Sequence, residues 1–222
     1  MSKIGIIGCG WLGKPLYNKL SQNYSVECFD RKSTDDNSNF WSSDTIIISI
    51  NTKDNYIETL KKIKNLTSKN IILCSSISLY REFDNIVDES AIITKESIQK
   101  EAEEIFEDAL ILRLGGLMGY DRVAGRWKKV SKFQDGKVNY IHRDDVINII
   151  ELSIKTSLTK GVFNLVAPLH PLRSEVHYSN SKKFGFEMGS FSGNSNREIL
   201  SNKIMNRLNY KFKYPNPLEF WD

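Results

Sequence analysis

The sequence has few cysteines and prolines, and it contains no long run of apolar residues. Its 222 residues include only 3 cysteines and 5 prolines. No apolar stretch reaches the roughly 20 residues that a membrane-spanning helix needs, and no leader-like pattern precedes the first expected strand. We therefore expect no association with a membrane.

The three cysteines, Cys9, Cys28 and Cys74, have no metal-ligand spacing and do not make up a disulfide framework. This pattern predicts free thiols, no metal centre and a reducing, cytoplasmic environment. The net charge is +4, with both signs interspersed along the chain. The sequence therefore lacks the basic patch of a nucleic-acid-binding protein, and we expect no nucleic-acid partner.

Short apolar runs alternate with segments of helical periodicity along most of the chain. The expected strands are residues 4–7, 25–29, 45–50, 70–75, 109–114, 137–141 and 162–166. The expected helices are residues 11–22, 53–66, 94–106, 123–133, 144–155, 172–184 and 197–208. This alternation predicts an α/β fold with a doubly wound parallel sheet covered on both faces.

Two regions depart from the alternation. Residues 30–44 are polar and too few for a full crossover helix, so this side of the sheet should be looped or truncated. After residue 166 the strict alternation ends, which predicts a small helical cap. We expect one folding unit, with a core over residues 1–166 and a cap over residues 167–222. The aromatic segment 210–221 should pack on the domain itself or on a partner subunit, which leaves a homodimer open.

A glycine-rich turn follows the first expected strand. Gly8, Gly10 and Gly13 have the Gly-x-Gly-x-x-Gly spacing, with Trp11 and Leu12 between the last two. The first glycine permits a tight turn, the second lets the backbone approach a pyrophosphate, and the third lets the helix pack against the strand. Because the loop lies between a strand and a helix, it predicts a Rossmann-type dinucleotide site. The alternative is a glycine-rich turn that no longer binds a nucleotide.

Three charged residues follow the second expected strand. Asp30 lies about 20 residues after the glycine loop, where a carboxylate can accept hydrogen bonds from ribose hydroxyls, as in NAD sites. Arg31 and Lys32 come next and could hold the 2′-phosphate of NADP. The sequence thus predicts NAD or NADP as the cofactor and favours NAD.

The fourth expected strand ends in hydroxyl-bearing residues. Ser75, Ser76, Ser78 and Tyr80 lie at or just after its carboxyl end. In open α/β sheets, this edge is where ligands bind. We therefore expect a small-molecule substrate site here.

Several segments together resemble the extended short-chain dehydrogenase/reductase family of sugar-nucleotide epimerases and dehydratases. The segments that carry this resemblance are 75–80, 87–89, 110–119, 138–146 and 162–166, in the family's order. The resemblance makes Ser76 the counterpart of the family's catalytic hydroxyl. It implies an NAD(P)-dependent oxidoreductase or epimerase that acts on a hydroxyl-bearing, sugar-nucleotide-like substrate.

One departure from the family concerns the acid/base pair. The family has a Tyr-x-x-x-Lys motif, but residues 94–103 contain no tyrosine. Lys95 or Lys100 could keep the cofactor-holding role, and Tyr80 could replace the missing tyrosine or pack above the nicotinamide pocket. The sequence therefore resembles an atypical subgroup. The alternative function is a non-catalytic NAD(P)-binding sensor or scaffold.

Overall fold

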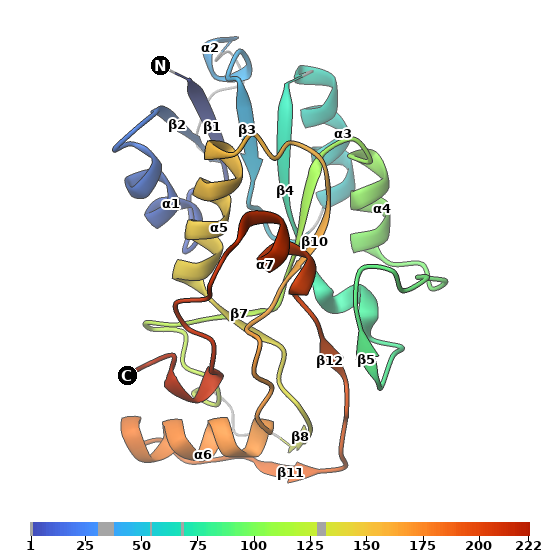
Figure 1. Cartoon of the computed structure of the whole chain (residues 1–222), viewed down its shortest axis with the longest axis vertical. Coiled ribbons are helices and arrows are strands. Elements are labelled where there is room, and N and C mark those ends of the chain that lie inside the picture. The colour runs from blue at the N-terminus through green and yellow to red at the C-terminus, as the bar shows by residue number, and fades with distance from the viewer. Residues whose placement is uncertain (1, 31–37, 54, 68, 128–131) are drawn as a thin grey trace. The chain divides into compact units, whose positions relative to one another are not determined.

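The computed structural model describes residues 2–30, 38–53, 55–67, 69–127 and 132–222 (Figure 1). The chain divides into two compact units. The sheet unit comprises Met1–Leu79, Ile93–Arg113 and Ile147–Phe163, and the second unit comprises Tyr80–Ile92, Leu114–Val146 and Asn164–Asp222. Among the described residues, no helix is long and apolar enough to cross a membrane.

The central sheet has six strands. In chain order they are β1 (Lys3–Ile7), β2 (Ser25–Phe29), β3 (Thr45–Ile48), β4 (Asn70–Ser76), β6 (Leu110–Leu114) and β10 (Gly161–Leu165). Their order in the sheet is β10-β6-β4-β3-β1-β2, and β1 pairs in parallel with both β2 and β3. The chain therefore winds outward from β1 in both directions, which confirms the predicted doubly wound α/β fold.

The connection from β2 to β3 contains only a short helix, α2 (Ser38–Trp41), among its described residues. The sequence predicts no full crossover helix over residues 30–44; residues 38–44 agree with this prediction, and residues 31–37 lie outside the described residues. In this strand order β2 stands at the end of the sheet, next to β1 (Figure 1).

Helices α3 (Tyr56–Leu66) and α4 (Ile98–Ile105) pack together on one face of the sheet. Ile46 and Ile48 of β3 point into this layer, where they meet Leu60 of α3 and Phe106. Because side chains alternate along a strand, Ile47 points to the opposite face. Ile47 is also wholly buried, so the second face of the sheet is covered as well. Helices α1 (Gly13–Leu20) and α5 (Arg143–Lys155) complete the helices that flank the sheet.

The second unit is built from short elements. Its strands are β5 (Ile86–Val87), β7 (Gly116–Met118), β8 (Lys132–Gln134), β9 (Tyr140–His142), β11 (Ser190–Ser192) and β12 (Glu198–Ile199). They form three parallel pairs, β5–β12, β7–β9 and β8–β11. Its helices are α6 (Arg173–Phe184) and α7 (Asn202–Leu208), with the 3-10 turn η2 (Pro217–Glu219). The 3-10 turn η1 (Ile77–Tyr80) lies where the chain passes from the sheet unit to the second unit.

The buried carboxylate of Asp145 holds the C-terminal segment. It accepts hydrogen bonds from the hydroxyl of Tyr210 at 2.6 Å and from the amides of Lys213 and Tyr214 at 2.8 and 3.0 Å. Trp221 packs against the cluster around Val138. The sequence left open whether the aromatic segment 210–221 packs on the domain itself or on a partner subunit. In the structure it packs on its own chain.

One predicted helix is wrong and another is half correct. Residues 123–127 form turns rather than the start of a helix, and residues 132–134 form strand β8. The physical reason is Gly125, whose φ of +92° is incompatible with a right-handed helix. The predicted helix 197–208 is half correct, because Glu198 and Ile199 pair with β5 and the helix begins at Asn202.

Candidate functional site

The glycine loop joins β1 to α1, and two of its glycines are required by close packing. Gly8 has a φ of +100°, and a Cβ there would collide with the carbonyl oxygen of Ser49. A Cβ on Gly13 would collide with the carbonyl oxygen of Gly8. These contacts set the sharp turn and bring the start of α1 against the end of β1, as the sequence pattern predicts.

Gly10 is different, because a Cβ on this residue would meet nothing within 4 Å. Its carbonyl accepts the amide of Lys14 at 2.9 Å, so the loop runs directly into α1. The N-cap residue, Leu12, makes no side-chain cap hydrogen bond. The loop therefore leaves open space beside Gly10 and a helix N-terminus without a side-chain cap, an arrangement that fits the pyrophosphate of a dinucleotide. Trp11 is half-buried and Leu12 is buried.

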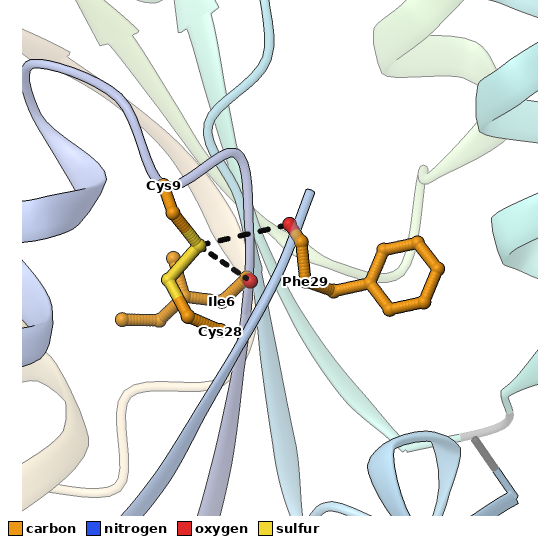
Figure 2. Close-up of a disulfide and its surroundings, with 4 residues drawn as sticks. All are labelled: Ile6, Cys9, Cys28 and Phe29. Atoms are coloured by element: carbon orange, nitrogen blue, oxygen red, sulfur yellow. Dashed lines mark hydrogen bonds between the residues drawn. A yellow bond between two sulfur atoms is a disulfide. The ribbon is translucent and has the colours of Figure 1, made fainter. Parts of the chain in front are cut away.

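A disulfide joins the glycine loop to β2, between Cys9 and Cys28 (Figure 2). The prediction that all three cysteines are free thiols is therefore wrong, and only Cys74 is free. The two cysteines are 19 residues apart in sequence, but β1 and β2 are neighbours with Ile7 opposite Phe29. With two of the three cysteines joined in a disulfide, the cysteines no longer indicate a reducing compartment.

The residues predicted to contact the adenosine ribose follow β2. Asp30 is exposed and comes directly after Phe29, the last residue of the strand. Arg31 and Lys32 lie outside the described residues. Because β2 lies beside β1, Asp30 and the glycine loop are at the same edge of the sheet.

Ser76 is the last residue of β4 and is half-buried. Its Oγ accepts a hydrogen bond from the amide of Ser78 at 3.2 Å. The carboxyl end of the strand thus presents a hydroxyl, as the sequence predicts.

Tyr80 belongs to the second unit and is wholly buried. Its hydroxyl donates a hydrogen bond to Oδ1 of Asn164 at 3.1 Å. Of the two roles open to Tyr80, this burial favours packing over acid/base catalysis.

Helix α4 occupies the region where the resembled family has its Tyr-x-x-x-Lys pair. Lys100, the candidate cofactor-holding lysine, donates to Glu96 at 2.6 Å along the helix. One turn later, Glu103 is buried and accepts hydrogen bonds from Ser75 at 2.6 Å and from Arg113 at 2.6 Å. The sequence analysis missed this network. A signal was present, since Arg113 interrupts an apolar strand and a buried guanidinium needs a carboxylate partner.

No protein-family model matches the chain. Among curated proteins, the chain is similar to protein YeeZ of Escherichia coli. The two are 25% identical over an alignment of 270 positions that covers 98% of each chain.

Solved structures share the fold over nearly the whole chain. A short-chain dehydrogenase/reductase superfamily protein from Agrobacterium tumefaciens with bound NAD has a TM-score of 0.74 at 13% identity, covering 98% of this chain and 95% of that one. MoeE5 in complex with UDP-glucose and NAD has a TM-score of 0.75 at 13% identity, covering 99% and 97%. The human epimerase family protein SDR39U1 with NADPH has a TM-score of 0.75 at 14% identity, covering 98% and 97%.

The chain thus has the Rossmann-type fold of the NAD(P)-dependent epimerase and short-chain dehydrogenase/reductase proteins. This confirms, as a likeness of fold, the resemblance to the atypical extended members that the sequence motifs indicate.

Proposed function

We propose that this protein binds a nicotinamide dinucleotide at the glycine loop and acts as an oxidoreductase or epimerase on a hydroxyl-bearing substrate. The observation that carries the proposal is that the protein's own packing requires only two of the three glycines. Packing requires Gly8 and Gly13, whereas the protein's own packing leaves the space beside Gly10 empty. A glycine at an open position suits a ligand that must approach the backbone closely.

Asp30 at the end of β2 supports NAD as the preferred cofactor. Its carboxylate would accept hydrogen bonds from ribose hydroxyls and repel a 2′-phosphate. The solved structures that share the fold include complexes with NAD and with NADPH, so the fold itself accommodates both. MoeE5 was solved in complex with UDP-glucose and NAD, which supports a sugar nucleotide as the substrate class for this chain too.

The bound nicotinamide would supply hydride transfer. On the protein side, we assign Ser76 the role of orienting the substrate oxygen by a hydrogen bond from its hydroxyl. Residues 94–103 hold no tyrosine, and the Tyr80 hydroxyl is buried against Asn164. General acid-base catalysis typically contributes 10²- to 10⁴-fold, so we expect slow turnover.

A second candidate function is a non-catalytic dinucleotide-binding sensor. The specific observation in its favour is the structure of α4, where Glu103 forms a buried ion pair with Arg113 and Lys100 pairs with Glu96. The two charged side chains of this helix that could take part in catalysis, Lys100 and Glu103, are therefore both in ion pairs with other residues of the protein. A sensor needs the glycine loop alone, which is intact.

The deciding experiment is a screen of nucleotide sugars and simple alcohols with NAD and NADP, following nicotinamide absorbance and substrate isomerisation. The enzyme hypothesis predicts slow turnover that falls in Ser76→Ala and is retained in Ser76→Thr, which keeps the hydroxyl. Tyr80→Phe should change turnover little. Tight cofactor binding without turnover of any substrate would favour the sensor. Robust turnover that Ser76→Ala leaves unchanged would place the chemistry elsewhere.

A further inference from the structure

The disulfide between Cys9 and Cys28 lies inside the candidate dinucleotide site. Cys9 is the residue between Gly8 and Gly10, and Cys28 is two residues before Asp30. The two sulfurs therefore connect the segment proposed to hold the pyrophosphate with the strand that leads to the proposed ribose contact. Figure 2 shows the bonded sulfurs of the pair, with the Cys9 sulfur facing the carbonyl oxygens of Ile6 and Phe29.

The surroundings of the pair suit a disulfide and also suit two thiols. The Cα atoms of Cys9 and Cys28 are 6.0 Å apart, within the range that a disulfide spans. The Cys9 sulfur also lies 3.8 Å from the carbonyl oxygen of Ile6 and 3.7 Å from that of Phe29. A reduced Cys9 thiol would therefore find hydrogen-bond acceptors in place.

Both cysteines are half-buried, so a small oxidant or reductant can reach them. Cys74 differs, because burial raises the pKa of its thiol to about 12. Since the thiolate is the reactive species, Cys74 should exchange slowly.

We propose that Cys9 and Cys28 form a reversible redox modification site that controls affinity for the dinucleotide. This inference rests on the proposed function. The oxidised form fixes the glycine loop relative to the end of β2, in addition to the 2.9 Å hydrogen bond from the Gly8 amide to the Phe29 carbonyl. Fixing two segments that are proposed to contact the dinucleotide reduces the ordering cost of binding, so the oxidised form binds more tightly.

The oxidant is a low-molecular-weight disulfide such as oxidised glutathione. A cysteine thiolate attacks one sulfur of the oxidant and releases one small thiol, which leaves a mixed disulfide. The second cysteine attacks the protein sulfur of this intermediate and releases the second small thiol. Two protein thiols lose two protons and two electrons, the small disulfide gains them, and excess small thiol reverses the reaction. In a cytoplasm, where most thiols are kept reduced, such a disulfide is transient and redox-sensing.

Thermodynamic linkage relates dinucleotide binding to disulfide formation quantitatively. If the oxidised form binds the dinucleotide more tightly by some factor, then saturating dinucleotide must favour disulfide formation by the same factor. We expect a factor on the order of fivefold or more, the lower range of couplings between linked sites. This reciprocity separates control of binding from a disulfide that merely stabilises the fold.

The experiment uses the full chain oxidised with oxidised glutathione or reduced with excess thiol, with free thiols assigned by alkylation and mass spectrometry. Calorimetry gives the dissociation constants of NAD and NADP for each form, and glutathione buffers give the thiol–disulfide midpoint with and without saturating dinucleotide. Cys9→Ser and Cys28→Ser should bind like the reduced wild type under all conditions. Gly10→Val should form the disulfide without binding the dinucleotide, and its midpoint should not respond to NAD.

Three outcomes would overturn the inference. Equal affinities of the two forms would reject control by the disulfide and leave the proposed function intact. Failure of Cys9 and Cys28 to form a disulfide with oxidised glutathione would also reject control by the disulfide and leave the proposed function intact. Absence of NAD and NADP binding in both forms would reject the proposed function, and the inference with it. The expected result is tighter binding by the oxidised form together with a midpoint shift of equal size.

Discussion

Arg113 and Glu103 form a two-point ion pair in the interior of the sheet unit. The guanidinium donates from Nε to both carboxylate oxygens at 3.0 and 3.1 Å and from a terminal nitrogen at 2.6 Å. Their side chains are only 11% and 9% exposed. Ser75 adds a third donor, which ties the end of β4 to α4 and β6. The pair therefore holds together three elements that lie around the end of β4.

Removing one charge of this pair should be costly. Glu103→Gln removes the carboxylate that pairs with the buried Arg113 guanidinium, and breaking a buried pair in this way typically costs about 3–5 kcal/mol. Asp108→Asn is the matched control, because its ion pair with Lys160 is exposed and such pairs contribute little to stability. Urea unfolding measures the free energy of unfolding of both variants. Equal losses in the two variants would show that the buried pair has no special role.

Stability should depend on pH through His177. The side chain is 1% exposed and lies against the rings of Phe133 and Phe191, and neither ring nitrogen has a hydrogen-bond partner among the described residues. This burial lowers the pKa of His177 from 6.5 to about 4. Between these values the unfolded chain binds the proton and the folded chain does not. The contribution of His177 is therefore complete above pH 6.5 and is lost as the pH falls toward 4.

The loss should amount to about 3 kcal/mol, following the size of the pKa difference. The measurement is urea unfolding of the wild type and His177→Phe between pH 4 and 7. The variant removes the titrating group and keeps an aromatic ring. The difference in stability between the two proteins should shift in favour of the variant as the pH falls. A difference that stays constant over this range would contradict the buried neutral state of His177.

Cofactor preference should depend on Asp30. Because its carboxylate would repel a 2′-phosphate, the wild type should bind NAD more tightly than NADP, and Asp30→Ala should narrow or reverse the preference. Asp84→Ala, at an exposed acidic residue of the second unit, controls for the loss of one negative charge. Calorimetry with both dinucleotides gives the ratio of the dissociation constants of NAD and NADP for each variant. A tenfold preference of the wild type for NADP, about 1.4 kcal/mol, would show that Asp30 does not set selectivity.

The sequence predicted the six strands of the central sheet well, because each is a short apolar run bounded by polar residues. The predicted strand 137–141 is wrong as a member of this sheet, because only Tyr140–His142 forms a strand and it pairs with β7. Strand 25–29 is observed as β2 with both ends as expected. The second unit was harder, since strands of two or three residues carry no periodic signal and pair over long distances, as β5 does with β12. The predicted helix 123–133 followed from the spacing of Val123 and Trp127 and was wrong, because a glycine with positive φ lies between them.

The candidate site likewise contains one feature that the local sequence predicts and others that depend on long-range contacts. The glycine loop is a local pattern, and its packing follows the sequence motif. The Cys9–Cys28 disulfide and the Glu103–Arg113 pair depend on which strands and helices become neighbours. Composition alone argued against any disulfide. Only the pairing of β1 with β2 brings the two cysteines together.

The most direct test of the account is dinucleotide binding by Gly10 variants. The backbone of Gly10 has no positive φ, and a Cβ meets nothing within 4 Å, so Gly10→Ala and Gly10→Val should fold with little loss of stability. In calorimetric titrations with NAD and NADP, the wild type should bind, Gly10→Ala should bind more weakly and Gly10→Val should not bind. Affinity in folded Gly10→Val equal to that of the wild type would contradict the proposed dinucleotide site.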